Sequence, residues 1–353
     1  MKKNVKAAIL SELKKPLLIL DDLCLPDPIH GQVLVKIEFT GICHSQLMEI
    51  DGYRGKDNWL PHCLGHEAVG VVVASGKGVK KVKEGDRVVV GWIRCKGINA
   101  QNPTYSSKTI GTVNAGSCTT FSNFSIISEN RVSLLPKEFP VELGALLGCA
   151  LPTGAGIVIN QMKPASEDNV LIVVLGGIGF SSLIALRALG NKNIICIDID
   201  DSKLKTALHL GASKVINGKK FSVDIIKKKL KEYTNNQGID YAIEAAGLTE
   251  TIELSFECLS SRGTLFFASH PKFGDKIKLD PFELISGKNI FGSWGGQSDP
   301  DKFIPKFTKL IRGSEGDLET LVDRFQGIDK INEAISSLRM KKINRAMIDL
   351  RYE

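Results

Sequence analysis

A buried strand that turns through glycines into a helix is the feature that most constrains the fold of this chain. The apolar run Asn169–Leu175 is followed at once by Gly176-Gly177-Ile178-Gly179, and Phe180–Leu189 then shows helical spacing. A second apolar run, Asn193–Ile197, comes next and ends at Asp198. This order predicts a βαβ unit, which belongs in a parallel sheet that helices cover on both faces.

The region after this unit continues the same alternation of strands and helices. We expect helices near 201–210, 223–233 and 250–259, and strands near 214–216, 241–245 and 263–268. Strands that alternate with helices in this way favour a doubly wound parallel sheet. We therefore predict one α/β domain over residues 153–298.

The first part of the chain has a different pattern. Residues 1–152 contain short apolar runs such as Val33–Ile37 and Val69–Ala74, bounded by glycine and charged residues, which predicts a small β-barrel domain. The tail, 299–353, holds two helical segments and a last apolar run, Ala346–Leu350. We expect this last run to form a strand of the first domain, so that 1–152 and 299–353 make one domain.

Composition excludes several classes of function. The net charge of +7 is mild, and the densest basic run, Lys227–Lys231, is interleaved with apolar residues at helical spacing. This run predicts the solvated side of a helix, and no nucleic-acid partner is expected. We expect no membrane segment and no secretory signal, since the N-terminal apolar run Ala7–Leu10 is short. The expected location is cytoplasmic.

The glycine turn also predicts a cofactor. Gly176, Gly177 and Gly179 would let the backbone approach a pyrophosphate at the start of the helix, and Asp198 would bind the adenosine ribose hydroxyls. The acidic side chain would repel the extra phosphate of NADP, so NAD is the expected cofactor. Val174 stands where the first glycine of this motif is usual, and we expect it to form a turn with ordinary backbone angles.

A second group of residues indicates a metal site. His66 lies between Gly65 and Glu67, just before a predicted strand, and Cys43 and Cys149 complete a Cys₂His set. Such a set is a known catalytic zinc arrangement, with a fourth position open to substrate.

Three segments resemble the zinc-containing alcohol dehydrogenases of the medium-chain dehydrogenase/reductase superfamily, and the likeness extends over almost the whole chain. They are Gly65-His66-Glu67 with Gly70, Gly76 and Val79; Gly41-Ile42-Cys43-His44-Ser45; and Leu147–Gly154. The resemblance implies a GroES-like β-barrel catalytic domain and a Rossmann domain. It also implies that Cys43, His66 and Cys149 bind one catalytic zinc.

The resemblance implies roles for residues around the zinc. Glu67 would lie behind the metal or bind it transiently, and a buried salt bridge with Arg345 is compatible with that role. Ser45 would pass the substrate proton onward. His44 and Arg345 would reach the cofactor phosphates.

Two further residues have implied roles at the cofactor. Thr153 would lie beside the nicotinamide, and Lys203 near the adenosine ribose. A plain surface position remains the alternative for Lys203.

The sequence departs from the family pattern at three places. Met48 stands where many relatives have a histidine that relays the proton, and Gln46 where an aspartate is frequent. The stretch Cys95–Tyr105 lacks the four closely spaced cysteines that hold a structural zinc in many members. We therefore expect a single zinc in each chain.

Together these patterns predict a zinc-dependent oxidoreductase that transfers hydride between an alcohol or polyol and NAD. A dehydrogenase specific for a sugar, cyclitol or amino sugar is the alternative, and a non-catalytic nucleotide-binding member of the fold is a third reading. The expected partners are a small-molecule alcohol, polyol or sugar derivative and copies of the same chain. A homodimer or homotetramer would pair edge strands such as one near Ile290.

Overall fold

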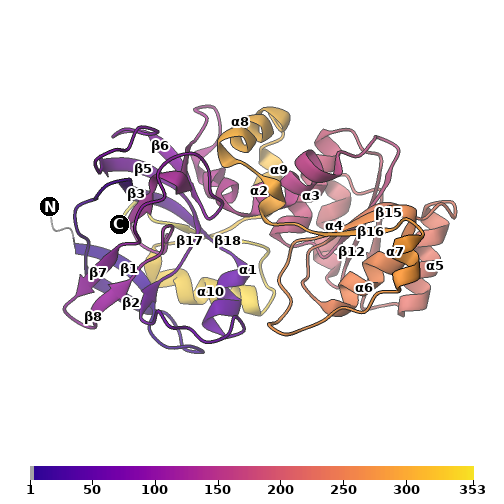
Figure 1. Cartoon of the computed structure of the whole chain (residues 1–353), viewed down its shortest axis with the longest axis horizontal. Coiled ribbons are helices and arrows are strands. Elements are labelled where there is room, and N and C mark those ends of the chain that lie inside the picture. The colour runs from indigo at the N-terminus through magenta and orange to yellow at the C-terminus, as the bar shows by residue number, and fades with distance from the viewer. Residues whose placement is uncertain (1–3) are drawn as a thin grey trace. The chain divides into compact units, whose positions relative to one another are not determined.

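The computed structural model describes residues 4–353, which form two compact units (Figure 1). The first unit contains the chain up to Cys149 together with Asp299–Thr308 and Leu321–Glu353. The second contains Ala150–Ser298 and Lys309–Thr320. The short segment Lys309–Thr320 belongs to the second unit, where Asp317 forms an ion pair with Arg187.

The first unit is built from a closed barrel and a sheet. The barrel order is β1 (Asn4–Leu10), β2 (Leu18–Cys24), β7 (Thr104–Ser107), β8 (Gly111–Asn114) and β4 (His62–Cys63). The sheet order is β10 (Val132–Leu134), β6 (Arg87–Gly91), β5 (Glu67–Ser75), β3 (Gln32–Ile42), β18 (Ala346–Asp349) and β17 (Asp323–Gln326), with β9 (Phe124–Ser128) paired to β3. The apolar runs that predicted strands lie in β3 and β5.

The last strand returns to the first unit, as the sequence indicated. β18 pairs with β3 in antiparallel register, and Ala346 lies opposite Ile42. This register brings the residue before β18, Arg345, to the end of β3 that leads into Cys43. Arg345 thereby lies close to Cys43, which is about 300 positions earlier in the sequence.

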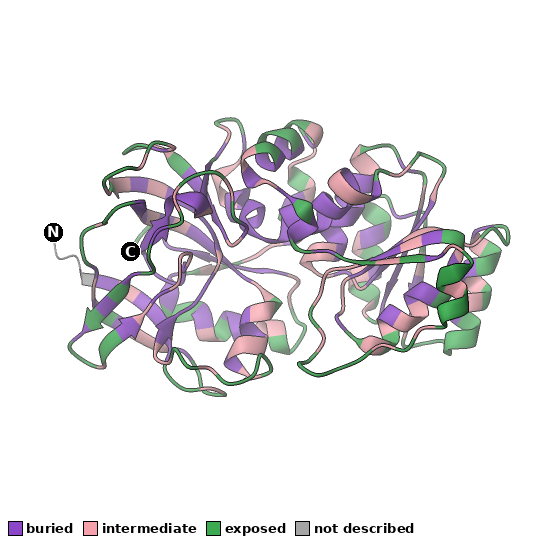
Figure 2. Cartoon of the chain, in the orientation of Figure 1, coloured by how far each residue is buried: buried purple, intermediate pink, exposed green. Residues whose placement is uncertain are grey.

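The second unit is a parallel sheet that helices flank. Its six strands run in the order β13 (Lys214–Asn217), β12 (Asn193–Asp198), β11 (Asn169–Val173), β14 (Ile239–Glu244), β15 (Leu259–Phe267) and β16 (Asn289–Gly292). Every neighbouring pair is parallel. Figure 2 shows the inner strands of this sheet largely buried, and every residue of β11 is buried, which explains why β11 reads as an unbroken apolar run.

The helices of the second unit include the three predicted near 201–210, 223–233 and 250–259. The unit contains α2 (Ala150–Gly156), α3 (Gly177–Ala188), α4 (Asp201–His209), α5 (Val223–Tyr233), α6 (Thr249–Glu257), α7 (Pro281–Ile285) and α9 (Gly316–Glu319). Asp200 caps α4 by accepting a hydrogen bond from the Ser202 N–H, and the Ser222 side chain caps α5 in the same way. The first unit contributes α1 (His44–Ile50) and α10 (Ile331–Arg339), and α8 (Pro300–Leu310) begins there.

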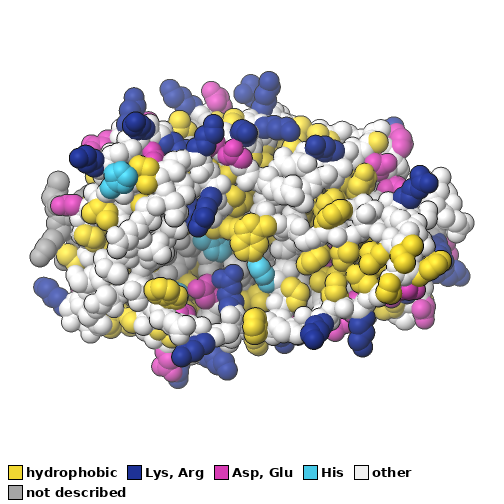
Figure 3. Space-filling view, viewed as in Figure 1, with side chains coloured by type: hydrophobic (Ala, Val, Ile, Leu, Met, Phe, Trp, Pro, Cys, Tyr) yellow, Lys and Arg dark blue, Asp and Glu magenta, His cyan; other side chains and the backbone are white. Residues whose placement is uncertain are grey.

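The basic run on α5 is a solvated helix face, as expected. Ile226 and Leu230 are buried against the sheet, Lys228 is exposed, and Lys227 pairs with Glu257. On the face in Figure 3, lysines and arginines are scattered over the surface. Among residues 4–353, no single helix is long and apolar enough to cross a membrane, although the bent pair Val141–Gly148 and Ala150–Met162 passes that test together.

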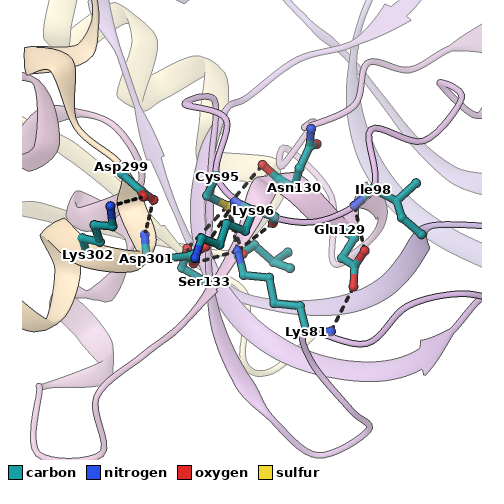
Figure 4. A network of polar contacts seen from close by, with 11 residues as sticks. Lys81, Cys95, Lys96, Ile98, Glu129, Asn130, Ser133, Asp299, Asp301 and Lys302 are labelled. Carbon is teal, nitrogen blue, oxygen red and sulfur yellow. Dashed lines mark hydrogen bonds and ion pairs between the residues drawn. The ribbon is translucent and has the colours of Figure 1, made fainter.

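A lysine, Lys81, binds the lobe that we define as the segment around Cys95 and Lys96 (Figure 4). The Lys81 ammonium lies 2.8 Å from the Cys95 sulfur and 2.7 Å from an Asp301 carboxylate oxygen, and it donates to the Lys96 carbonyl at 3.1 Å. The Cys95 thiol donates to the Asn130 carbonyl at 3.2 Å. One ammonium therefore connects three separate segments at the place where many relatives have a structural zinc.

A backbone turn supports the same lobe. The Glu129 carboxylate accepts hydrogen bonds from the backbone N–H groups of Lys80, Lys81 and Ile98 at 2.7–2.9 Å. These bonds lower the pKa of the Glu129 carboxyl even though burial opposes its charge. The carboxylate thus remains charged and holds the Lys81 backbone close to the lobe.

Replacing Lys81 should loosen this lobe. We expect Lys81→Met to lower the free energy of unfolding by about 1 kcal/mol, because Asp301 and the Lys96 carbonyl lose a half-buried charged partner. Urea denaturation followed by tryptophan fluorescence measures the change. The exposed Lys83 provides the control, and an equal effect of Lys83→Met would show that the contacts of Lys81 are unimportant.

Candidate functional site

Three potential metal ligands converge in the first unit. Cys43 precedes α1 as its N-cap, His66 precedes β5, and Cys149 follows the 3₁₀ segment Val141–Gly148. The two sulfur atoms lie 3.9 Å apart, and one ligand atom from each of the three residues lies within 4.8 Å of the others. The fold therefore brings together the Cys₂His set predicted from the sequence.

The chemistry of this set fits a tetrahedral zinc ion. With zinc–sulfur bonds of about 2.3 Å, two ligating sulfurs lie about 3.8 Å apart, close to the observed separation. The hydrogen bond from the Cys149 thiol lowers the pKa of Cys43 well below its usual range, and His66 adds to this effect. The same hydrogen bond raises the pKa of Cys149. The Cys149 thiol thus donates to the Cys43 sulfur, and the two sulfurs lie at the separation that a shared zinc ion requires.

A buried ion pair lies beside these ligands. The Arg345 guanidinium donates to Oε1 of Glu67, and the two side chains are 9% and 0% exposed. Burial raises the pKa of the Glu67 carboxyl, and Arg345 opposes that rise. Burial also disfavours the charge of Arg345, but Glu67 and the two cysteines raise its pKa above the usual value. The Arg345 guanidinium is thus the group that compensates a charged Glu67 carboxylate in this buried place.

One oxygen of this carboxylate lacks a partner within the described residues. Oε2 of Glu67 is buried and accepts no hydrogen bond, and Nε of Arg345 is also buried without a partner. A buried carboxylate oxygen without a partner is costly, and a nearby cation would satisfy it. Glu67 thus fits a place behind a metal ion.

Glycines make room for this carboxylate. A Cβ at Gly41 would lie 2.1 Å from Oε1 of Glu67, and one at Gly148 would lie 2.3 Å from the Val90 carbonyl oxygen. Both approaches are too close for any other residue. The glycines flanking Cys43 and Cys149 therefore belong to the packing of the site.

Gln46 is a site residue to which the sequence assigned no role. Its side-chain oxygen accepts from the Cys43 N–H at 2.7 Å, and its side-chain nitrogen lies 2.8 Å from Nδ1 of His66. The side chain is 1% exposed. The sequence could have indicated this role, because Gln46 lies in the first turn of a helix that begins just after the predicted ligand Cys43.

The other residues predicted near the zinc lie on α1. His44 is exposed and begins the helix, while Ser45 and Met48 are half-buried. Nothing in these positions tests the proton and phosphate roles, which stay predictions.

A second cluster in the same unit also gathers potential ligands. Nε2 of His62 lies 2.8 Å from an Asp57 oxygen and 3.9 Å from a Glu49 oxygen, and Nδ1 contacts the Cys63 carbonyl at 3.0 Å. Through these contacts the His62 ring, at β4, links the 51–61 loop to the end of α1.

The predicted cofactor turn lies in the second unit, between β11 and α3. Gly176 is the N-cap of α3 and Gly177 is its first residue. A Cβ at Gly179 would lie 2.2 Å from the Val174 carbonyl oxygen, so this glycine allows helix and turn to pack closely. The arrangement leaves the first backbone N–H groups of α3 directed past the end of β11, where an anion is stabilised.

The expectation of ordinary backbone angles at Val174 was wrong. Val174 has φ of +75°, in the left-handed region that favours glycine. Its N–H donates to the Ile197 carbonyl at 2.8 Å, which fixes the turn against β12. The fold imposes a glycine-like conformation on a β-branched residue, and the position is strained.

The remaining predicted cofactor residues are also in the second unit. Asp198 ends β12 and is buried, and its oxygens accept from the N–H groups of Leu175 and Asp200 at 2.7 and 3.0 Å. Lys203 is half-buried on α4, and Thr153 is buried on α2. The structure brings Asp198 to the glycine turn, and the roles of Lys203 and Thr153 stay predictions.

Comparisons with known proteins support both the predicted zinc site and the predicted cofactor domain as features of one family. Residues 177–312 match the zinc-binding dehydrogenase model, and residues 29–137 match the alcohol dehydrogenase GroES-like domain. The crystal structure of an alcohol dehydrogenase zinc-binding domain protein from Burkholderia ambifaria is 30% identical, with 98% of each chain covered and a TM-score of 0.89. The chain belongs to the zinc-containing alcohol dehydrogenase family. The family prediction and the fold class, a GroES-like barrel with a Rossmann domain, are confirmed.

Other members of this family and fold are also similar. Benzyl alcohol dehydrogenase from Acinetobacter calcoaceticus is 29% identical, with coverage of 98% of this chain and 99% of that one and a TM-score of 0.87. A 2R,3R-butanediol dehydrogenase from Bacillus subtilis is 24% identical, covers the same shares and has a TM-score of 0.78, which shows a shared fold. This dehydrogenase is therefore an oxidoreductase of a zinc-binding family.

Breaking the buried ion pair should destabilise this dehydrogenase strongly. We expect Arg345→Met to lower the free energy of unfolding by about 3–5 kcal/mol, because Glu67 is left charged and buried without its partner. Urea denaturation measures the loss. The double variant Glu67→Gln with Arg345→Met should recover part of it, and a double variant as unstable as the single one would contradict this account.

Removing the Val174 side chain should relieve strain. We expect Val174→Gly to raise the free energy of unfolding by about 1 kcal/mol, because glycine adopts positive φ without a Cβ clash. Thermal denaturation of the two proteins tests this. Val174→Ala keeps a Cβ and should recover less, so an alanine variant as stable as the glycine variant would argue against backbone strain.

Proposed function

We propose that this chain transfers hydride between an alcohol or polyol and NAD at a zinc ion held by Cys43, His66 and Cys149. The observation that carries the proposal is the Cys₂His set, with its sulfurs 3.9 Å apart and the unpartnered Glu67 oxygen beside it. A set of three ligands leaves a fourth position for the substrate oxygen.

Zinc supplies Lewis acidity, which favours loss of the alcohol proton and polarises the carbonyl in the reverse direction. The residues of the chain supply the rest. Cys43 and Cys149 would hold the zinc through their sulfurs, and the Glu67 carboxylate, positioned by Arg345, would stabilise the charge of the ion. Ser45 is proposed to accept the substrate proton and to pass its own hydroxyl proton to water or to the cofactor ribose, because it lies two residues after Cys43 in the first turn of α1.

The cofactor half of the proposal rests on the turn between β11 and α3. Gly176 and Gly177 open the start of α3 to a pyrophosphate, and Asp198 is fixed at the turn by two backbone N–H groups. A buried carboxylate at this place disfavours the additional phosphate of NADP. Lys203 and Thr153 are proposed to contact the ribose and the nicotinamide, and His44 and Arg345 the cofactor phosphates.

The substrate class is proposed from relatives. The Acinetobacter relative is named for benzyl alcohol, which supports an alcohol as the substrate here. A second copy of the chain is the proposed partner through β16, because this edge strand and α7 expose Phe282, Ile285 and Phe291.

Metal content and turnover test the proposal together. Elemental analysis should find about one zinc per chain, and a panel of alcohols and polyols should be oxidised with NAD in preference to NADP. Cys43→Ser should lose both zinc and turnover, because serine is a poor zinc ligand. The half-buried Cys24 on β2 provides the matched control, and Cys24→Ser should keep both.

The opposite results would overturn the proposal. Wild-type protein that binds neither zinc nor NAD and oxidises none of the panel would indicate a non-catalytic member of the family. Equal zinc content in the Cys43→Ser and wild-type proteins would show that the metal lies elsewhere.

A further inference from the structure

The Gln46 side chain bridges two groups that lie beside the proposed zinc. Its oxygen accepts from the Cys43 N–H at 2.7 Å, and its nitrogen faces Nδ1 of His66 at 2.8 Å. Since the side chain is 1% exposed, solvent has little access to either end of the amide. Each end must therefore match the group that it faces.

The amide matches His66 only in one hydrogen-bonding state. With its oxygen occupied by the Cys43 N–H, Gln46 presents an N–H donor to Nδ1, which must then accept. A neutral imidazole that accepts at Nδ1 carries its hydrogen on Nε2. Nδ1 is engaged by Gln46, so Nε2 is the nitrogen left to bind a metal, and a hydrogen there blocks binding.

The state of His66 that binds metal has the opposite requirement. A neutral imidazole that offers a lone pair at Nε2 carries its hydrogen on Nδ1, and that N–H needs an acceptor. Rotating the amide by half a turn would provide an acceptor for His66, but it would direct the amide N–H groups at the Cys43 N–H. An amide has one acceptor end and therefore cannot satisfy both donors.

We propose that Gln46 sets the zinc affinity of this site, by favouring the form of His66 that does not bind metal. The inference rests on the proposed function, because it concerns the same Cys₂His set. Gln46 acts through His66 and Cys43, so it is a positioning residue. Binding of zinc must break one buried hydrogen bond of Gln46. The zinc affinity of the site is therefore lower than it would be with two acceptors at position 46.

A carboxylate of the same size has those two acceptors. Glutamate at position 46 could accept from the Cys43 N–H with one oxygen and from Nδ1–H of His66 with the other. Outer hydrogen-bond partners of metal-bound histidines change metal affinity by about 10–100-fold. We therefore expect Gln46→Glu to bind zinc about 10-fold more tightly or better than the wild type.

The added charge needs its own control. Met48 lies on the same helix, is half-buried, and stands two residues from Gln46. Met48→Glu adds one negative charge to α1 without placing an acceptor in the bonds that Gln46 makes. A general electrostatic attraction for zinc would tighten binding in both variants, whereas hydrogen-bond matching favours Gln46→Glu alone.

The experiment measures zinc affinity rather than turnover. Demetallated full-length wild type, Gln46→Glu and Met48→Glu are titrated with zinc in competition with a chromogenic chelator under reducing conditions. The inference predicts a gain of at least about 10-fold for Gln46→Glu over both other proteins. Unchanged affinity in Gln46→Glu, or an equal gain in Met48→Glu, overturns the inference and leaves the proposed function intact.

Two further outcomes are distinguishable. Absence of zinc binding in all three proteins overturns the proposed function and the inference together. A thermal melt of each demetallated protein shows whether it folds, and Gln46→Asp replaces Gln46→Glu if that variant does not. A gain in affinity with Gln46→Asp supports the inference, and no gain overturns it.

Discussion

The buried ion pair between Glu67 and Arg345 is the interaction on which the rest of the first unit depends. Glu67 begins β5, and Arg345 precedes β18 near the end of the chain. A carboxylate that is fully buried is tolerated only because a guanidinium is brought to it. The return of the C-terminal strand to β3 is therefore required by the electrostatics of the site as well as by the sheet.

The same pair explains why the surrounding glycines and cysteines lie where they do. Gly41 and Gly148 remove the side chains that would collide with Glu67 or with the backbone beside it. Cys43 and Cys149, which lie two residues and one residue after these glycines, then come close enough for the Cys149 thiol to donate a hydrogen bond to Cys43 at 3.9 Å. One packing arrangement therefore leaves space for the Glu67 carboxylate and also brings the two cysteines together.

Hydrogen-bond matching decides the finer properties of both units. Asp198 is held by two backbone donors, and the Lys81 ammonium by acceptors from two other segments, so each charged group has partners of the right kind. Val174 differs, because glycine would adopt its positive φ with less strain. Such local conflicts are expected at functional sites, where the fold over-determines the conformation.

The sequence by itself determined the class of fold, the family and the identity of the candidate ligands. These depend on local signals: the apolar run of β11 followed by glycines, and the Gly-His-Glu motif between two cysteines. The sequence also offered Arg345 as a salt-bridge partner of Glu67, which the structure confirms. Only the tertiary structure decided that Gln46 contacts His66 and that Lys81 contacts the segment of Cys95. Those contacts depend on strand register and on side-chain direction, which a linear pattern does not contain. Val174 shows the same limit, since the sheet and α3 set its backbone angles against its own preference.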